Sequence, residues 1–420
     1  MRFLAALALV ASSTAYTAPH NITETRKPPS TELTEIAPVS TDSLTRFSVF
    51  GDSLSDIGNT WELTRALKGE VPPDILFKVL NADIENSEFG KILAKLGITV
   101  DDLKHLEDSV TQKLLEELNK VIHIPVYPND YYFQGRFSNG PVWNEWLVTM
   151  TDVQFTSGDY FLNRAYGGSF ASDPKDDMHL EGQLIPPDMK LIVNAYLKEY
   201  PAEKGKAWMQ GNQGFSVLYG GNDYIYDFYN YQIVVQRIVE QVIRLADFAS
   251  QSATQDAPNW IFVGNLPDLA WVPRYKTGTD KNKGPLLSKT VAGHNRLLSE
   301  QIQSLQQKYA SKQVRIELLD VYSLVKNELQ SDHYKIKDQP CYNIVYKMGQ
   351  DLKRSAKEVV PCPKENWDDY AFWDPIHPSR KLHANIAYQV CQTTFSKVGA
   401  RCFMPAYNKP ETYPNTAHNP

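Results

Sequence analysis

The stretch Phe47-Ser-Val-Phe-Gly-Asp-Ser-Leu-Ser-Asp-Ile-Gly-Asn59 joins a short apolar run to a polar turn. The run over 47–50 has the length and composition of a buried strand. Ser53 follows it almost at once, with a glycine and an aspartate before it and a second aspartate after it. A serine in this position either caps the turn that leads into a helix or acts as a nucleophile. The remaining sequence has to distinguish these two interpretations.

Strand-like runs alternate with amphipathic segments along the chain. Beyond the first run, strands are expected over 214–219, 260–263 and 314–319, and helices over 233–245, 286–310 and 379–392. Strands separated by helices form right-handed βαβ units, so the sequence predicts an α/β fold with a parallel central sheet covered on both faces. Ligands of such sheets bind at the carboxyl ends of the strands, where Ser53 stands.

The segment from about 70 to 122 has helical periodicity and no strand signal. Thr99-Val-Asp-Asp102 resembles an N-terminal capping arrangement, and apolar residues follow it at three- and four-residue steps from Leu103 to Val121. The segment therefore predicts a helical insertion, which either packs on the core or forms a lid that covers an acyl chain.

The chain has 420 residues and a formal net charge of −6, with acidic and basic residues mixed along the sequence. A nucleic-acid surface needs clustered Lys and Arg, so no nucleic-acid partner is expected. The length allows one large domain or two ordinary ones. We place a single domain over 44–402 and a C-terminal tail over 403–420.

The N-terminal residues have the pattern of a secretory signal peptide, which we place over 1–18. Arg2 precedes a short apolar run, and small residues follow up to Ala18. The run is too short to span a bilayer, and no other stretch is long and apolar enough for a transmembrane helix. Residues 19–43 are rich in Thr, Ser, Pro and Glu and predict a flexible leader, with a candidate glycosylation triplet at Asn21. We therefore expect a secreted, extracellular protein.

Four cysteines lie late in the chain, which suits an oxidising compartment. They are Cys341, Cys362, Cys391 and Cys402. Three pairings are possible, and nearness in sequence favours Cys341–Cys362 and Cys391–Cys402. No Cys-x-x-Cys spacing occurs, so neither a zinc site nor a redox site is expected.

A nucleophilic serine needs a base, a group that orients the base, and donors for the oxyanion. His377 stands out among the nine histidines because Asp374 precedes it by three residues and a proline follows each of the two. Such a turn can hold the carboxylate against the imidazole, where it fixes the tautomer and stabilises the imidazolium. His383 falls in the following helix, where packing or capping is the expected role.

Oxyanion donors are usually backbone amides beside glycine or side-chain amides. Gly167 and Gly168 form a glycine pair after a β-like run that ends near Asn163. Asn222 directly follows the strand candidate over 214–219. The alternative for each stretch is a tight turn that needs a positive φ.

Together these motifs resemble those of the GDSL (SGNH) hydrolases. Four of them occur in the order found in that family: Gly51-Asp-Ser-Leu54, the glycine pair after Asn163, Gly220-Gly-Asn-Asp223 and Asp374-Pro-Ile-His377. The resemblance spans roughly residues 45–395, and the segments Phe133–Trp143 and Val263–Pro267 add to it.

The resemblance implies a flavodoxin-like three-layer αβα fold. It also implies that Ser53 is the nucleophile, that His377 is its base and that Asp374 orients the base. Three further motif residues would order the turn around Ser53. These residues are Asp52, Asp56 and Asn59.

For the oxyanion, the resemblance implies a site made of the Ser53 amide, the Gly168 amide and the Asn222 side chain. Gly168 is preferred to Gly167 because the family's donor glycine lies five residues after the asparagine. No metal and no other cofactor is required.

The leading functional interpretation is a secreted hydrolase of lipid esters, of the lipase, phospholipase or lysophospholipase type, with transient contact to a lipid interface. Acyl transfer would result where an alcohol replaces water. An alternative is a carbohydrate acetyl esterase, in which the aromatic residues line a sugar cleft. A third interpretation is an inactive binding protein, but the presence of Ser53, Asp374 and His377 argues against it.

Overall fold

The computed structural model describes residues 44–67, 131–151, 161–171, 187–202, 209, 212–344, 360–404 and 406–409. The predicted signal peptide, the leader with its glycosylation triplet at Asn21 and the predicted insertion at 70–122 lie outside these ranges.

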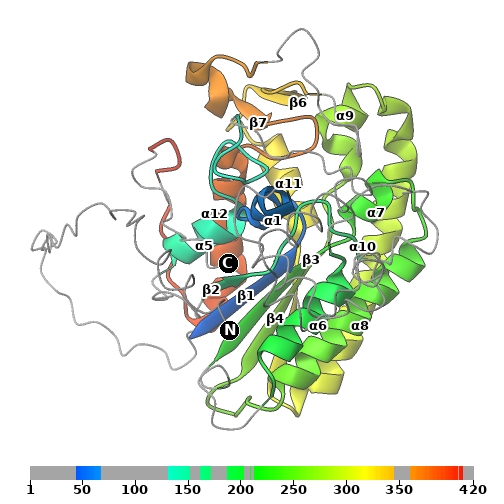
Figure 1. Ribbon diagram of the computed structural model, residues 1–420, viewed down its shortest axis with the longest axis vertical. Coiled ribbons are helices and arrows are strands. Elements are labelled where there is room, and N and C mark those ends of the chain that lie inside the picture. Colours follow the sequence, from blue (N-terminus) through cyan, green and yellow to red (C-terminus); the bar gives the residue numbers. More distant parts are fainter. Residues whose placement is uncertain are drawn as a thin grey trace, which may run out of the picture. The chain divides into compact units, whose positions relative to one another are not determined.

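The core is a five-stranded parallel sheet with the strand order β2-β1-β3-β4-β5 (Figure 1). Its strands are β1 (Arg46–Gly51), β2 (Phe161–Asn163), β3 (Gln213–Leu218), β4 (Asn259–Gly264) and β5 (Val314–Leu319). The predicted parallel sheet is confirmed. The chain runs from β1 outward to β2 and then returns to β3 on the other side of β1. This reversal makes the carboxyl ends of β1 and β3 the expected place for a ligand.

Helices cover both faces of the sheet, which gives the three layers (Figure 1). On one face lie α6 (Met189–Glu199), α8 (Tyr231–Ala249) and α10 (Gly284–Ala310). On the other lie α5 (Trp143–Met150), α11 (Val321–Gln330) and α12 (Arg380–Thr393). The short helical segments are α1 (Asn59–Leu67), α7 (Gly221–Ile225), α9 (Pro273–Lys276), η4 (Leu269–Trp271), η5 (Lys281–Lys283), η6 (Lys364–Asp369) and η7 (Phe395–Val398), where η denotes a 3₁₀ helix.

The sequence patterns explain why these elements form. Every residue of β1, β3 and β4 is buried, as expected for strands covered on both faces, and such strands appear as nearly continuous apolar runs. Helix α8 instead buries one stripe, which includes Val234, Ile238 and Val242. Each side chain of this kind contributes roughly 1.5–3 kcal/mol when it leaves water.

A second, two-stranded sheet pairs β6 (Ile336–Pro340) with β7 (Tyr370–Phe372) in parallel. A disulfide joins Cys341, just after β6, to Cys362, and a second joins Cys391 to Cys402. This is the pairing that nearness in sequence favoured. The small sheet matters for the site because β7 leads directly into the turn that carries Asp374 and His377.

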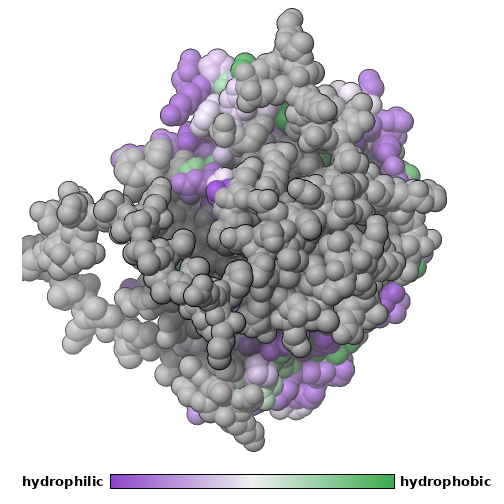
Figure 2. All heavy atoms as spheres, in the orientation of Figure 1, coloured by the Kyte–Doolittle hydropathy of each residue, from purple (hydrophilic) through white to green (hydrophobic). Residues whose placement is uncertain are grey.

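On the face shown in Figure 2, the coloured surface is mostly hydrophilic, and hydrophobic residues appear singly. The large hydrophobic side chains that are exposed among the described residues are Leu286, Val360, Phe403 and Met404. Within the described ranges, no helix combines the length and the apolar content that a membrane span requires.

Candidate active site

Ser53 lies in a tight turn at the carboxyl end of β1. The amides of Ser55 and Asp56 both donate to the carbonyl of Asp52 at 3.0 Å, and the Asp52 carboxylate accepts from the amide of Leu54 at 3.1 Å. Helix α1 begins only after this turn. Its N-terminus is held by the Asp56 carboxylate, which accepts from three consecutive amides of residues 58–60 at 2.6–3.1 Å. Asp56, not Ser53, therefore fills the capping role.

The Ser53 hydroxyl instead meets His377. The distance from Ser53 Oγ to His377 Nε2 is 2.9 Å, and the distance from His377 Nδ1 to Asp374 Oδ2 is 2.7 Å. A carboxylate can only accept, so Nδ1 donates to Asp374 and Nε2 is left to accept from Ser53. The other oxygen of Asp374 accepts from the amides of Ile376 and His377, each at 2.8 Å. All three side chains are buried, and the structure brings each within hydrogen-bond distance of the next.

Tyr132 makes a further contact with this group. Its hydroxyl donates to Asp374 Oδ2 at 2.8 Å, the same oxygen that accepts from His377. Phe137 lies against the His377 ring with 5.1 Å between the centroids. The sequence interpretation flagged the neighbouring segment but missed Tyr132. Its position next to that segment was the one hint that the sequence offered. The contact itself could not be predicted, since Asp374 lies 242 positions away.

The start of α5 and the segment that leads into it support both turns of the site. Near the nucleophile, Trp143 Nε1 donates to Ser55 Oγ at 3.0 Å and Asn144 Nδ2 donates to Ser55 O at 2.8 Å. Near His377, Ser138 Oγ donates to the carbonyl of Pro378 at 3.1 Å. The sequence marked this segment only through its likeness to a family, and the contacts give it a physical role.

The candidate oxyanion residues follow the two neighbouring strands. Gly168 comes after β2 with φ +82°, a conformation that favours glycine. The Gly167 amide already donates to Asp56 Oδ2 at 2.8 Å, whereas within the described ranges the Gly168 amide has no hydrogen-bond partner.

Asn222 lies in α7, directly after β3. Its Nδ2 donates one hydrogen bond to the carbonyl of Ser169 at 2.9 Å. That bond fixes the orientation of the amide and leaves its second N–H for another acceptor. Asn222 lines the same pocket as Ser53 and His377, whereas Gly168 is joined to Asn222 only through its neighbour Ser169.

The turn around Ser53 is tied to the loop that carries Gly168. Asp56 accepts from the Gly167 amide. Asn59, at the start of α1, donates from Nδ2 to the carbonyls of Asn163 at 3.1 Å and Ala165 at 2.9 Å. Asp56 and Asn59 thus order this part of the chain, in the way that the family likeness implied.

Burial changes the protonation of two other groups near Ser53. Loss of water raises the pKa of Asp52 to about 7, although the Leu54 amide opposes this change. Burial lowers the pKa of His383 to about 3, so its ring is neutral. His383 Nδ1 accepts from the amide of Trp143 at 3.3 Å, at the start of α5. Of the two roles that the sequence left open for His383, packing and capping, this contact corresponds to capping.

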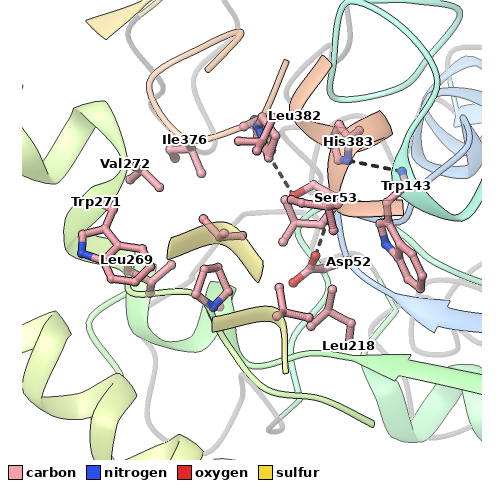
Figure 3. Close-up of a pocket in the computed structure, with 18 of the residues that line it drawn as sticks. Asp52, Ser53, Trp143, Leu218, Leu269, Trp271, Val272, Ile376, Leu382 and His383 are labelled. Carbon is pink, nitrogen blue, oxygen red and sulfur yellow. Dashed lines mark hydrogen bonds between the residues drawn. The ribbon is translucent and has the colours of Figure 1, made fainter. Parts of the chain in front are cut away.

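A pocket opens beside Ser53 (Figure 3). It contains about 890 Å³ of space free of atoms, including the solvent at its mouth. Ser53 and Asp52 lie on one side of it, and residues of η4 lie on the opposite side. Most of its lining is apolar. Among the described residues, no group of three or more His, Cys, Asp or Glu side chains is placed to hold a metal ion.

Comparison with known proteins identifies the family. The model of the GDSL-like lipase/acylhydrolase family matches residues 48–390. The thermolabile hemolysin of Vibrio parahaemolyticus is 23% identical over 276 residues, which cover 64% of this chain and 58% of the hemolysin. The secreted effector protein SseJ of Salmonella typhimurium is 25% identical over 280 residues, which cover 66% of this chain and 59% of the effector. The matches thus span a little under three fifths of each relative's length. The match to the family model covers most of the sequence, and the chain belongs to the GDSL-like lipase/acylhydrolase family.

Proposed function

We propose that this protein is an exported serine hydrolase of lipid esters. Ser53 is the nucleophile, His377 the general base, and Asp374 the group that orients and stabilises the imidazole. The observation that carries the proposal is the unbroken chain of short hydrogen bonds from Ser53 Oγ through His377 to Asp374. Such a chain activates a hydroxyl that would otherwise be a weak nucleophile at neutral pH.

In the acylation step, Ser53 Oγ attacks the ester carbonyl carbon while His377 Nε2 takes the hydroxyl proton. The carbonyl π electrons move onto the oxygen, which becomes an oxyanion. When the tetrahedral intermediate collapses, the bond to the alcohol oxygen breaks and His377 returns the proton to that oxygen. The products of this step are the free alcohol and an acyl group bound to Ser53.

In the deacylation step, water attacks the acyl-enzyme and His377 takes one of its protons. The bond to Ser53 Oγ then breaks, the proton returns to Ser53, and the carboxylic acid leaves. The net reaction consumes one ester and one water and yields one acid and one alcohol. Where an alcohol occupies the position of water, the same steps transfer the acyl group to it.

The Ser53 amide, the Gly168 amide and the Asn222 side chain are proposed to hold the oxyanion. Support comes from the positive φ of Gly168 and from the second N–H of Asn222, which the bond to Ser169 leaves available. Donors fixed in advance in a partly dry site stabilise developing charge without having to reorganise.

Lipid esters are favoured over carbohydrate esters because the lining of the pocket is mostly apolar. A sugar cleft needs many polar groups to replace the water that a sugar loses. One of the relatives is named a hemolysin. We therefore keep acetylated carbohydrate as a comparison in the assay and not as a second proposal.

Export is supported by the two disulfides and by the relative that is named a secreted effector. We retain the proposals of a signal peptide over 1–18 and of one hydrolase domain over 44–402.

The test is product release by the purified protein from phospholipid vesicles, lysophospholipid, triacylglycerol, a short-chain aryl ester and acetylated xylan. Ser53→Ala is expected to lower turnover by roughly 10⁶-fold without unfolding the protein. Ser304→Ala, on the exposed side of α10, is the matched control and should retain full activity. Near-wild-type turnover in Ser53→Ala would refute the mechanism. Release of acetate from xylan with lipids untouched would refute the lipid assignment.

A further inference from the structure

The pocket beside Ser53 extends away from the reacting groups along α12. Leu382, Ile386 and Val390 line it, and they lie at four-residue steps on one face of that helix. Residues at such steps form a continuous stripe along one side of a helix. The pocket therefore follows the helix for two turns.

The facing wall comes from the strand ends and from α11. Leu319 ends β5, and Val321 and Val325 lie one turn apart in α11. All three are buried. With the residues of α12, they form an apolar channel that has α12 on one side and α11 and the end of β5 on the other.

Polar groups are concentrated at the Ser53 end of the channel. Asp268, which precedes η4, also borders the pocket, but its carboxylate already accepts from the Ser288 hydroxyl at 2.7 and 2.8 Å and from the Ala270 amide at 2.9 Å. A ligand beyond the Ser53 end of the channel therefore meets mainly hydrocarbon.

Protein interiors are normally packed as densely as organic crystals, and unfilled apolar space destabilises a fold. An apolar channel that starts at a buried serine–histidine pair is therefore the arrangement expected of a binding site.

We infer that this channel holds the acyl chain of the substrate, with the ester carbonyl at Ser53 and the chain directed along α12 toward Val325 and Val390. The inference rests on the proposed function, since it places the carbonyl at the proposed nucleophile. It adds that the channel closes at these two valines and so selects acyl chains of medium length.

The length follows from the helix. Eight residues separate Leu382 from Val390, and at 1.5 Å per residue they span about 12 Å. With carbon–carbon bonds of ~1.5 Å in a zigzag, this distance holds roughly eight to ten carbons. Shorter chains leave part of the channel unfilled, and longer chains do not fit within it.

The first experiment measures kcat/KM for a series of p-nitrophenyl esters from acetate to palmitate. The wild-type protein is expected to prefer the octanoate and decanoate esters over both ends of the series by roughly tenfold or more. Val325→Phe fills the closed end and should move the optimum to shorter chains. Val390→Ala enlarges the same end and should move it to longer ones. Leu297→Phe, on α10 and away from the pocket, controls for the added bulk and should leave the profile unchanged.

Opposite shifts in the two variants would support the inference. The same chain-length profile in wild type, Val325→Phe and Val390→Ala would overturn it while leaving the proposed function intact. If Val325→Phe does not fold, the chain-length profile of Val390→Ala tests the inference by itself, because an enlarged channel must favour longer chains.

A binding measurement separates the channel from the chemistry. Decanoate should raise the melting temperature of Ser53→Ala, and this rise should be lost when Val325→Phe is added. If no ester is hydrolysed in a Ser53-dependent way, the proposed function fails, and decanoate binding then tests the channel by itself. Equal shifts with and without Val325→Phe would show that the channel is not the site.

Discussion

The capping of α1 by Asp56 is what leaves Ser53 available for chemistry. Serine and aspartate are both favoured at helix N-termini, and a sequence with both in one turn does not say which is used. In the structure, Asp56 accepts from the amides at the start of α1, and Ser53 lies within hydrogen-bond distance of His377. The serine at the end of β1 is thus free to act as a nucleophile.

Tyr132 is expected to tune the base through Asp374. Replacing Tyr132 with Phe removes the phenol that donates to Asp374 Oδ2 and leaves more negative charge facing His377. The imidazolium form of His377 should then be favoured, so the acidic limb of the kcat/KM profile moves to higher pH. Asp374 also loses a donor that fixes its position, so it orients His377 less well, and kcat should fall roughly tenfold if the loss of ~1.5 kcal/mol appears in the activation barrier.

The control for this measurement is Tyr370→Phe, which alters a tyrosine packed on the same aromatic cluster. It should leave the pH profile in place. A fall in kcat for Tyr132→Phe without movement of the acidic limb would indicate a purely structural role for the phenol.

Asp52 makes stability depend on pH. The ordinary pKa of an aspartate carboxyl is 3.8, and burial in the folded protein raises the pKa of Asp52 to about 7. The folded state therefore holds the proton more tightly than the unfolded state, and stability falls as pH rises from about 4 to 7. Asp52→Asn should remove this decline, which amounts to at most about 4 kcal/mol.

The measurement is the free energy of unfolding by urea at several pH values from acid to neutral. Asp332→Asn, at an exposed position, is the control and should follow the wild type. Equal slopes for wild type and Asp52→Asn would show that Asp52 does not carry the effect.

At the scale of elements, the β6–β7 sheet fixes the turn that carries Asp374 and His377. The Cys341 amide donates to the carbonyl of Phe372 at 3.1 Å, and the Tyr342 amide donates to that of Trp373 at 2.6 Å. The disulfide from Cys341 to Cys362 lies at the end of this ladder. We therefore expect the position of Asp374 to depend on a bridge that does not touch it.

The two disulfides should consequently differ in what their removal does. They close loops of 21 and 11 residues, and the chain-entropy model gives each about 3 kcal/mol of stabilisation. The double variant Cys341→Ala/Cys362→Ala should lose both stability and turnover. The matched control Cys391→Ala/Cys402→Ala should lose a similar amount of stability and keep turnover once folded. Denaturation curves and kcat at a temperature where both variants are folded would decide, and equal kcat values would refute the difference.

Across the whole molecule, sequence patterns predicted the central strands and the long amphipathic helices. The central strands β1, β3 and β4 are buried along their whole length, so each contains a short, mostly apolar run. Strand β6, with the sequence Ile-Lys-Asp-Gln-Pro, has no such run and ends in proline, so it could not be recognised. Its stability comes from β7 and from the neighbouring disulfide, which are tertiary features.

The residues of the candidate site also differ in whether the sequence alone could reveal them. Ser53, Asp374 and His377 were recognisable because each lies in a short motif whose chemistry is local. Tyr132 was not, because its role depends on a partner 242 positions away. The pocket could not be predicted either, since its walls come from α11, α12 and the strand ends, and no periodicity in one segment describes a space between several.

The long separation between Ser53 and His377 also affects the chain while it is being made. The two residues lie 324 positions apart, yet their side chains are 2.9 Å apart in the folded protein. At a synthesis rate of ~5–20 residues per second, His377 leaves the ribosome roughly 15–65 s after Ser53. Throughout that interval the nascent chain carries a serine without its base. For the proposed lipid hydrolase, the Ser53–His377 pair therefore becomes complete only when translation is almost finished.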